Sequence, residues 1–258
     1  MSDGGIIGKL KRQIESSGAF SAWIGLNDMF VAEALARESF DAVTLDMQHG
    51  GVDFTGAARA IQTVAAAGKP TVVRVPLDDF ATASRLADCG AAAVIAPMIN
   101  SAAEARRFAD HMKLPPLGRR SWGPRAALSL SGLAARDYLR AANGFTLALA
   151  MVETREALDS LDEIVATPGI DGIFIGPSDL AIALSNGATA DMLGAPVNEA
   201  IDRIVACVKA RGKFAGLFCG DGARAKWARA HGVAFVTVST DLSAMCAGSR
   251  AELAIARS

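Results

Sequence analysis

The sequence has few cysteines and few aromatic residues. Its four cysteines are scattered, with no Cys-x-x-Cys spacing: Cys89, Cys207, Cys219 and Cys246. Zinc sites and disulfide frameworks usually show such spacings, so free thiols of a cytoplasmic protein fit better. Aromatic residues make up only 6% of the chain, and one of them is tyrosine. This scarcity argues against a stacking surface for single-stranded nucleic acid.

The chain also lacks a charge imbalance and long apolar runs. Its 26 Lys and Arg against 27 Asp and Glu give a formal net charge of −1. This balance gives no electrostatic reason to bind nucleic acid or an anionic membrane. Residues 1–18 are polar and charged, without an apolar core of signal-peptide length, and no long uncharged apolar run suggests a membrane span. We expect a cytoplasmic globular protein that binds neither nucleic acid nor membranes.

Short apolar segments instead alternate with alanine-rich amphipathic ones. Near-continuous runs of Val, Ile, Leu and Ala are typical of parallel strands buried on both faces. Eight strands alternating with eight helices predict a single (β/α)₈ TIM barrel domain over residues 1–258, because a doubly wound sheet usually has fewer strands and no G-x-G-x-x-G motif opens a helix. The strands are predicted at 20–26, 41–47, 71–76, 92–98, 146–154, 172–179, 214–219 and 235–240, and the helices at 32–38, 54–68, 79–90, 101–112, 155–166, 198–212, 221–232 and 242–258.

One connection, residues 114–144, is much longer than the others. Its GRRSWGPR segment contains Arg119, Arg120, Trp122 and Arg125. Loops of this length in compact domains are usually functional or disordered. The density of bulky and cationic residues favours a functional loop.

Ionisable residues collect where several predicted strands end. Asp46 and His49 follow the second strand in TLDMQHGG, Arg74 lies near the end of the third, Glu153 near the end of the fifth, and Asp179 just after the sixth. Barrel enzymes carry their chemistry at the carboxyl ends of the strands. A charge buried there without a partner costs several kcal/mol, so we expect these side chains to face a ligand.

Two of these residues are carboxylates on neighbouring strands. Glu153 and Asp179 repel each other if they converge, unless a proton or a cation lies between them. Mg²⁺ suits the pair, since it takes one or two carboxylates and keeps waters or substrate oxygens. Each residue alone could instead cap the helix that follows it; together on adjacent strand ends they favour a metal site.

The other charged residues allow two interpretations. Arg74 is either the partner of a strand-end acid such as Asp46 or a fixed donor for a carboxylate, keto oxygen or enolate. Asp46 could orient the imidazole of His49 for acid–base chemistry. His111 and His231 lie on predicted helices and are interpreted as structural.

The segment IGPSD, 175–179, bends the chain out of the sixth strand. The backbone N–H groups of Ser178 and Asp179 could form an anion-binding nest. Ser178 does not lie in a G-x-S-x-G motif, so it is not interpreted as a nucleophile. No predicted strand contains a lysine, so a Schiff-base mechanism lacks its nucleophile.

In combination these motifs resemble a known family. D-x-x-H after the second strand, V-R-V-P on the third, V-E-T-R-E-A on the fifth and F-I-G-P-S-D-L on the sixth occur in this order between Trp23 and Asp241. The chain is similar to the HpcH/HpaI family, class II metal-dependent pyruvate aldolases of the phosphoenolpyruvate/pyruvate barrel superfamily. The D-M-Q-H, A-M-V-E-T-R-E-A and G-R-R-S-W-G-P-R segments look most like its hydroxypyruvate/pyruvate aldolase subgroup.

The resemblance implies an activity and a role for each matching residue. The enzyme would reversibly cleave 4-hydroxy-2-oxo acids to pyruvate or hydroxypyruvate plus an aldehyde, through a metal-stabilised enolate. Glu153 and Asp179 would bind the divalent metal, Mg²⁺, Mn²⁺ or Co²⁺. His49, oriented by Asp46, would serve acid–base chemistry, and Arg74 would stabilise the enolate. The implied substrate-binding residues are Trp23, Gln48, Arg74, Gly176, Pro177 and Ser178.

The resemblance also implies an oligomer. Asp88 matches a catalytic acid that approaches the active site from a neighbouring subunit, and the family typically forms hexamers, as trimers of dimers, with the C-terminal helix at the dimer contact. Gln48 departs from the glutamate of many members, and Met151 from a frequent glutamine, which leaves the donor preference open.

Two alternatives remain at the level of the sequence. An enzyme like the citrate-lyase β-subunit or malyl-CoA lyase would share the barrel, the acids and Arg74. It would also need a surface for coenzyme A, and beyond the Arg119–Arg125 loop no basic tract offers one. The second alternative is a non-catalytic barrel that binds a 2-oxo acid.

Overall fold

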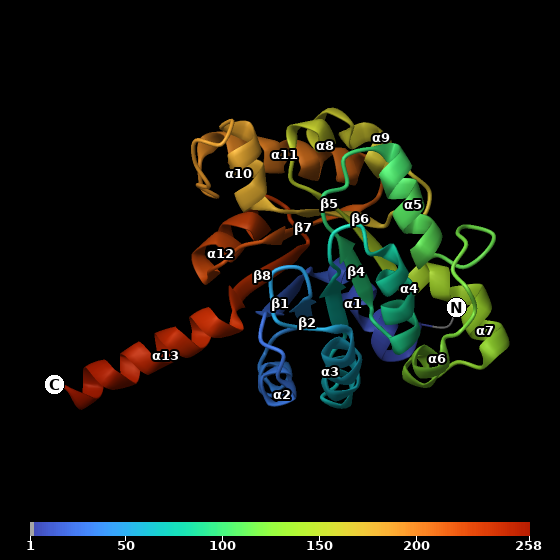
Figure 1. The fold of residues 1–258 in the computed structure, drawn as a ribbon, viewed down its shortest axis with the longest axis horizontal. Helices are drawn as coiled ribbons and strands as arrows, with labels where there is room; N and C mark the ends of the chain where they lie inside the picture. The colour runs from blue at the N-terminus through green and yellow to red at the C-terminus, as the bar shows by residue number, and fades with distance from the viewer. Residues whose placement is uncertain (1–2) are drawn as a thin grey trace.

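Eight parallel strands close into a barrel in the computed structural model, which describes residues 3–258 (Figure 1). Each strand is hydrogen-bonded to the next in sequence order, and β8 pairs with β1 to close the barrel. The predicted (β/α)₈ architecture is therefore confirmed. The strands are β1 Ala19–Ile24, β2 Ala42–Asp46, β3 Thr71–Arg74, β4 Ala93–Ala96, β5 Leu147–Val152, β6 Gly172–Ile175, β7 Phe214–Phe218 and β8 Phe235–Thr240.

The strands are buried because both of their faces are covered. All residues of β2 to β6 are buried, as expected when side chains alternate between the barrel interior and the surrounding helices. Aromatic rings of Trp23, Phe174 and Phe235 pack together, with centroid separations of 6.0 Å and 6.2 Å. The barrel is therefore a filled core, and space for a ligand remains only at its ends.

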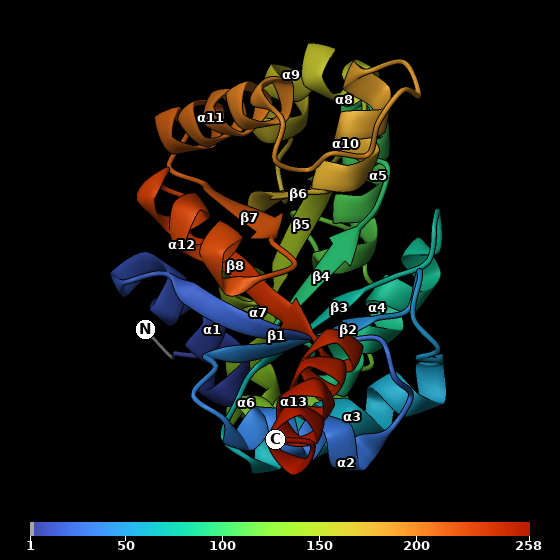
Figure 2. The ribbon, with the colours of Figure 1, turned by 90° about the vertical axis from the view of Figure 1, so that its left-hand side faces the viewer.

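Helices surround the strands, as the two views in Figures 1 and 2 show. Several begin at an Asp, Ser or Thr whose side chain accepts a hydrogen bond from the first turn, for example Asp53, Asp79 and Ser101. The helices are α1 Gly5–Ser16, α2 Met29–Arg37, α3 Phe54–Ala66, α4 Phe80–Cys89, α5 Ala102–Met112, α6 Arg125–Ser131, α7 Ala135–Phe145, α8 Arg155–Asp159, α9 Leu161–Ala166, α10 Pro177–Leu184, α11 Ala195–Ala210, α12 Gly222–Ala230 and α13 Asp241–Ala256.

The structure differs from the sequence-based prediction in several segments; the helix predicted at 155–166, for example, is divided into α8 and α9. Helix α1 was missed because polar and charged residues separate its apolar ones, although Ile7, Leu10 and Ile14 form a buried stripe. The predicted loop 114–144 contains α6 and α7. The sixth strand ends at Ile175 rather than continuing to 179, since Pro177 occupies the first turn of α10, a position where its missing N–H costs nothing.

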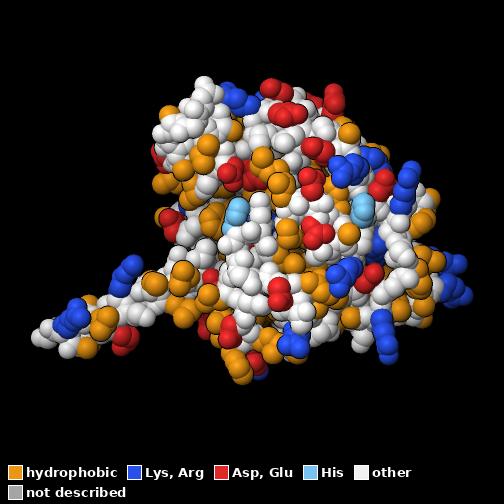
Figure 3. Space-filling view, in the orientation of Figure 1, with side chains coloured by type: hydrophobic (Ala, Val, Ile, Leu, Met, Phe, Trp, Pro, Cys, Tyr) orange, Lys and Arg blue, Asp and Glu red, His pale blue; other side chains and the backbone are white. Residues whose placement is uncertain are grey.

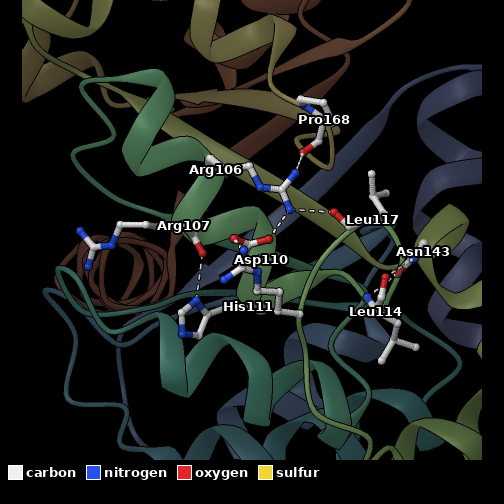
Figure 4. A network of polar contacts seen from close by, with 9 residues as sticks. Arg106, Arg107, Asp110, His111, Leu114, Leu117, Asn143 and Pro168 are labelled. Carbon is white, nitrogen blue, oxygen red and sulfur yellow. Dashed lines mark hydrogen bonds and ion pairs between the residues drawn. The ribbon is translucent and has the colours of Figure 1, made fainter.

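The segment between α5 and α6 is held in place by hydrogen bonds to neighbouring helices (Figure 4). The Arg106 guanidinium donates to the carbonyl oxygens of Leu117 (2.7 Å) and Pro168 (3.1 Å). The Asn143 side chain bonds the backbone N–H and the carbonyl of Leu114, at 2.7 and 2.8 Å. These contacts order the stretch that carries the GRRSWGPR motif.

The C-terminal helix α13 projects away from the barrel (Figures 1 and 2). Of its 16 residues only Asp241 is buried. Apolar side chains stand exposed along it, as the projecting arm in Figure 3 shows; the large ones are Leu242, Met245, Leu253 and Ile255. Across residues 3–258, no helix combines the length and apolar character needed to cross a bilayer.

Candidate active site

A cavity of about 280 Å³ opens at the carboxyl ends of the barrel strands. It brings together residues predicted from β1, β2, β3 and the start of α10. Met151, Phe218 and Thr240 also line it and were not predicted as site residues. All three lie near the ends of strands, β5, β7 and β8, and Met151 also stood out as a departure from a frequent glutamine of the family. The full lining is Trp23, Asp46, His49, Arg74, Met151, Gly176, Pro177, Ser178, Asp179, Phe218 and Thr240.

On one side of the cavity, Arg74 and Asp46 form a buried ion pair. The two residues are direct partners in the β2–β3 register. Arg74 Nε and Nη2 donate to Asp46 Oδ1 and Oδ2 at 2.9 and 2.7 Å, which is the two-bond geometry that guanidinium and carboxylate favour. The guanidinium also lies over the Trp23 ring, 4.9 Å from its centroid. Arg74 is thereby held in one orientation at the cavity wall.

Asp46 has further contacts that decide its relation to His49. Oδ1 accepts from the backbone N–H groups of Gln48 and His49 at 3.0 and 3.3 Å. Burial by itself raises the pKa of Asp46, but the bonds and charge of Arg74 and these two N–H groups outweigh it, so the pKa lies below its usual value. Among the described residues no hydrogen bond joins the carboxylate to the His49 imidazole. Asp46 therefore fixes the backbone that carries the exposed His49 ring rather than the ring itself.

Glu153 follows β5 next to Gly176, a residue of the cavity wall, and is only 2% exposed. Its Oε1 accepts from the Met98 N–H at 2.8 Å. Met98 has a φ of 55°, a left-handed conformation that is uncommon for a residue with a side chain and often marks a functional site. Burial, together with the negative charge of Asp179, raises the pKa of Glu153 to about 7.

Close contact between Glu153 and the start of α10 requires glycine at position 176. A Cβ atom there would lie 2.1 Å from Glu153 Oε2. Pro177 then begins α10, and exposed Asp179 lies in its first turn. The N–H groups of Ser178 and Asp179 are in that turn, where a helix leaves backbone donors without internal partners. This edge of the cavity thus offers carboxylates and an anion-binding helix end side by side.

The two carboxylates fit a hard divalent cation. Within residues 3–258 no cluster of three or more His, Cys, Asp or Glu side chains could enclose a metal, so a metal here would have two protein ligands and open positions. Mg²⁺ and similar ions accept this arrangement, with waters or substrate oxygens completing the shell. Burial and the charge of Asp179 raise the pKa of Glu153 although the Met98 N–H and the charge of Arg74 oppose this, and a cation beside it would favour the charged form.

Glu153 borders the cavity only through Gly176, and two other predicted residues lie apart from it. Asp88 lies on α4 in a separate groove of about 670 Å³, where its Oδ1 is 3.9 Å from Arg120 Nε. Burial raises the pKa of Asp88 although the charge of Arg120 opposes this. Gln48 is half-buried, and its Oε1 has no hydrogen-bond partner among the described residues. Within one chain, neither side chain reaches the site.

A closed (β/α)₈ barrel with charged residues at the carboxyl ends of its strands is the arrangement of a barrel enzyme. Comparison with known proteins specifies the class. The family model described as HpcH/HpaI aldolase/citrate lyase matches residues 20–247, and the chain belongs to this family. It is a class II aldolase, a carbon–carbon lyase that acts on small molecules.

Individual relatives agree with this assignment. A hydroxypyruvate/pyruvate aldolase of Rhizorhabdus wittichii is 40% identical over 243 residues, covering 94% of this chain and 96% of the relative. A 4-hydroxy-2-oxo-heptane-1,7-dioate aldolase of Salmonella dublin is 32% identical, covering 89% and 86%. The crystal structure of an HpcH/HpaI aldolase/citrate lyase family protein from Burkholderia cenocepacia superposes with a TM-score of 0.86 at 33% identity, covering 96% and 99%.

Proposed function

We propose that this aldolase reversibly cleaves 4-hydroxy-2-oxo acids into pyruvate or hydroxypyruvate and an aldehyde, with the enolate of the oxo acid as intermediate. One observation carries the proposal: a buried glutamate with a raised pKa borders, through Gly176, a cavity that a fixed guanidinium and a second acid, Asp179, line. The similarity to hydroxypyruvate/pyruvate aldolases supports the choice of donors.

Glu153 and Asp179 would hold the divalent cation, which we propose to be Mg²⁺, Mn²⁺ or Co²⁺. When bound, such an ion supplies a Lewis acid that makes the proton at C3 of a 2-oxo acid easier to remove. Gly176 leaves the space that Glu153 needs. The Ser178 N–H at the start of α10 would bind the carboxylate of the oxo acid, because helix N-termini favour anions.

Arg74 would stabilise the negative charge that develops on the enolate oxygen. Its ion pair with Asp46 uses Nε and Nη2, which leaves Nη1 for substrate. A donor that is held in place before the reaction stabilises developing charge without reorganisation. Trp23, which packs under the guanidinium, would complete the substrate-binding set.

His49 would move the proton between solvent and the reacting oxygen or carbon. It lines the cavity, and its backbone is anchored by Asp46. Imidazole is suited to this task because it accepts and releases protons near neutral pH.

We further propose that residues 1–258 form one aldolase domain and that the enzyme works in the cytoplasm as a homo-oligomer, a hexamer built as a trimer of dimers. The exposed apolar side chains of the projecting α13 support a subunit contact there. Asp88 lies outside the active-site cavity of its own subunit, which supports its insertion into the active site of a neighbouring subunit.

The test is product formation by chelator-treated protein with and without added metal. Mn²⁺, Mg²⁺ or Co²⁺ is combined with pyruvate or hydroxypyruvate and a panel of aldehydes that includes glyceraldehyde, and mass spectrometry detects new 2-oxo acids. We expect products only with metal. Full activity in metal-free protein would rule out the proposed mechanism. A requirement for a coenzyme A thioester would favour the citrate-lyase-like alternative, and no product with any aldehyde would favour the non-catalytic barrel.

A further inference from the structure

Asp241, the first residue of α13, is a buried carboxylate beside the cavity. It is 3% exposed, and no Lys, Arg or His side chain of the described residues forms an ion pair with it. Its Oδ2 accepts from the backbone N–H groups of Gly25 and Leu26 at 3.0 and 2.8 Å. Its neighbour Thr240 lines the cavity. Asp241 therefore ties the end of β8 to the loop after β1.

The loop after β1 in turn holds the loop that carries His49. The Gly25 carbonyl accepts from the Gly51 N–H at 2.7 Å. A Cβ atom on Gly50 would lie 2.8 Å from Gly25 Cα and 2.4 Å from the Asp46 carbonyl oxygen, so the two loops touch through their backbones. A movement of Gly25 would therefore be transmitted to the residues that follow His49.

His49 depends on these backbone contacts for its position. Among the described residues its ring makes no hydrogen bond, and the residue is exposed at the cavity rim. On one side the His49 N–H bonds Asp46, 3.3 Å away. On the other side the following two glycines contact Gly25, which Asp241 holds.

We propose that Asp241 is a positioning residue for His49. It acts through Gly25 and Gly51 and does not touch substrate. A charged acceptor that bonds two consecutive N–H groups fixes a loop more strongly than a neutral one. A displacement of about 1 Å at a reacting group can cost about a hundredfold in rate. The catalytic part of this inference depends on the proposed acid–base role of His49, whereas the structural part does not.

The structural part is tested with the full-length protein through the resonances of its histidine rings. The chain has three histidines, His49, His111 and His231. With ¹³C-labelled histidine rings and Mg²⁺ at one fixed pH, a His49→Gln variant identifies the His49 signal. We expect Asp241→Ala to move or broaden that signal and to leave the signals of His111 and His231 in place, since these two are anchored by Arg107 O and Asp202 respectively.

The catalytic part is tested by a double-mutant cycle on turnover. We expect Asp241→Ala to lower kcat about 10- to 100-fold in the wild-type background and less than about twofold in the His49→Gln background. The KM for the oxo acid should change little, because Arg74 and α10 are not involved. Asp241→Asn keeps an oxygen acceptor, so it should retain more activity than Asp241→Ala and serves if the alanine variant fails to fold.

Asp28→Ala is the matched control. Asp28 lies in the same loop and also accepts from two consecutive N–H groups, those of Phe30 and Val31, but they belong to α2. This variant should leave the His49 signal and turnover unchanged.

An unmoved His49 signal in folded Asp241→Ala and Asp241→Asn protein, or an equal loss of kcat in both backgrounds, overturns the proposal. If the wild type makes no product, or if His49→Gln keeps full activity, the proposed function is wrong. The positioning of His49 by Asp241 is then tested by the histidine ring signals alone.

Discussion

The charged groups on the two sides of the cavity are paired differently. On the β2–β3 side, Asp46 and Arg74 neutralise each other through two hydrogen bonds. On the β5–β6 side, buried Glu153 lies near a second acid, Asp179, and within residues 3–258 only the Met98 N–H is hydrogen-bonded to it. The first side holds a matched pair of opposite charges, whereas on the second side burial and a neighbouring acid disfavour the charged form of Glu153, which is where we propose the cation. The β2–β3 side therefore holds the Arg74 guanidinium in one orientation, and the β5–β6 side is the proposed binding site for the cation.

The largest expected effect comes from neutralising Glu153. Glu153→Gln should lower metal-dependent turnover by about a thousandfold or more, because a Lewis acid contributes several kcal/mol to the reaction. In chelator, the same variant should have a thermal midpoint equal to or above that of the wild type, since the charged form of Glu153 is unfavourable in its buried site. Turnover and thermal unfolding measure the two quantities.

Glu104→Gln is the control for Glu153. Glu104 also accepts backbone N–H groups after a barrel strand, from Asn100 and Ser101, and we expect turnover near that of the wild type. Near-normal turnover in Glu153→Gln would show that Glu153 is not a metal ligand and that the two sides of the cavity do not differ in the proposed way.

The next effect concerns the side with the ion pair. Arg74→Lys should lower turnover about a hundredfold, because an ammonium group cannot hold Asp46 with two parallel bonds and still offer a fixed donor to the enolate. Exchange of the C3 protons of pyruvate with deuterated solvent reports on enolate formation directly. Arg224→Lys, at another buried arginine outside the cavity, should leave exchange intact. Unimpaired exchange in Arg74→Lys would exclude the proposed role.

The smallest effect is on stability and its dependence on pH. Because Arg74 and two N–H groups hold the pKa of Asp46 below 3.8 in the folded state, the native protein binds fewer protons there than the unfolded chain. The stabilisation is therefore present above the ordinary pKa and is lost as the pH falls through the folded one. Asp46→Asn should lower the free energy of unfolding by about 2 kcal/mol at neutral pH.

Denaturant unfolding of both proteins across the acid range measures this difference. It should shrink as the pH falls below 3.8, the ordinary value for Asp46. A difference that stays constant with pH would mean that the lowered pKa of Asp46 does not stabilise the fold.

Much of the site could be predicted because residue type and strand position were enough. Arg74, Glu153 and Asp179 stand at the ends of apolar segments, and parallel strands place such ends together. The loop after α5 was predicted less well. Its helices α6 and α7 contain Gly, Ser and Asn, which weaken helical patterns. Arg106 and Asn143 order the segment between α5 and α6 through bonds to Leu117 and Leu114, which are not neighbours in the sequence.

The sequence by itself determined the eight-fold alternation, the barrel and the kinds of charged residue at its mouth, because burial periodicity and residue chemistry are local properties. Only the tertiary structure decided which charges are paired. Barrel register sets Asp46 beside Arg74 rather than the His49 ring, closure brings Asp241 from the end of β8 to the loop after β1, and Gly176 gives Glu153 its space. Hydrogen-bond partners depend on distances between segments far apart in the chain, and folding alone fixes those distances.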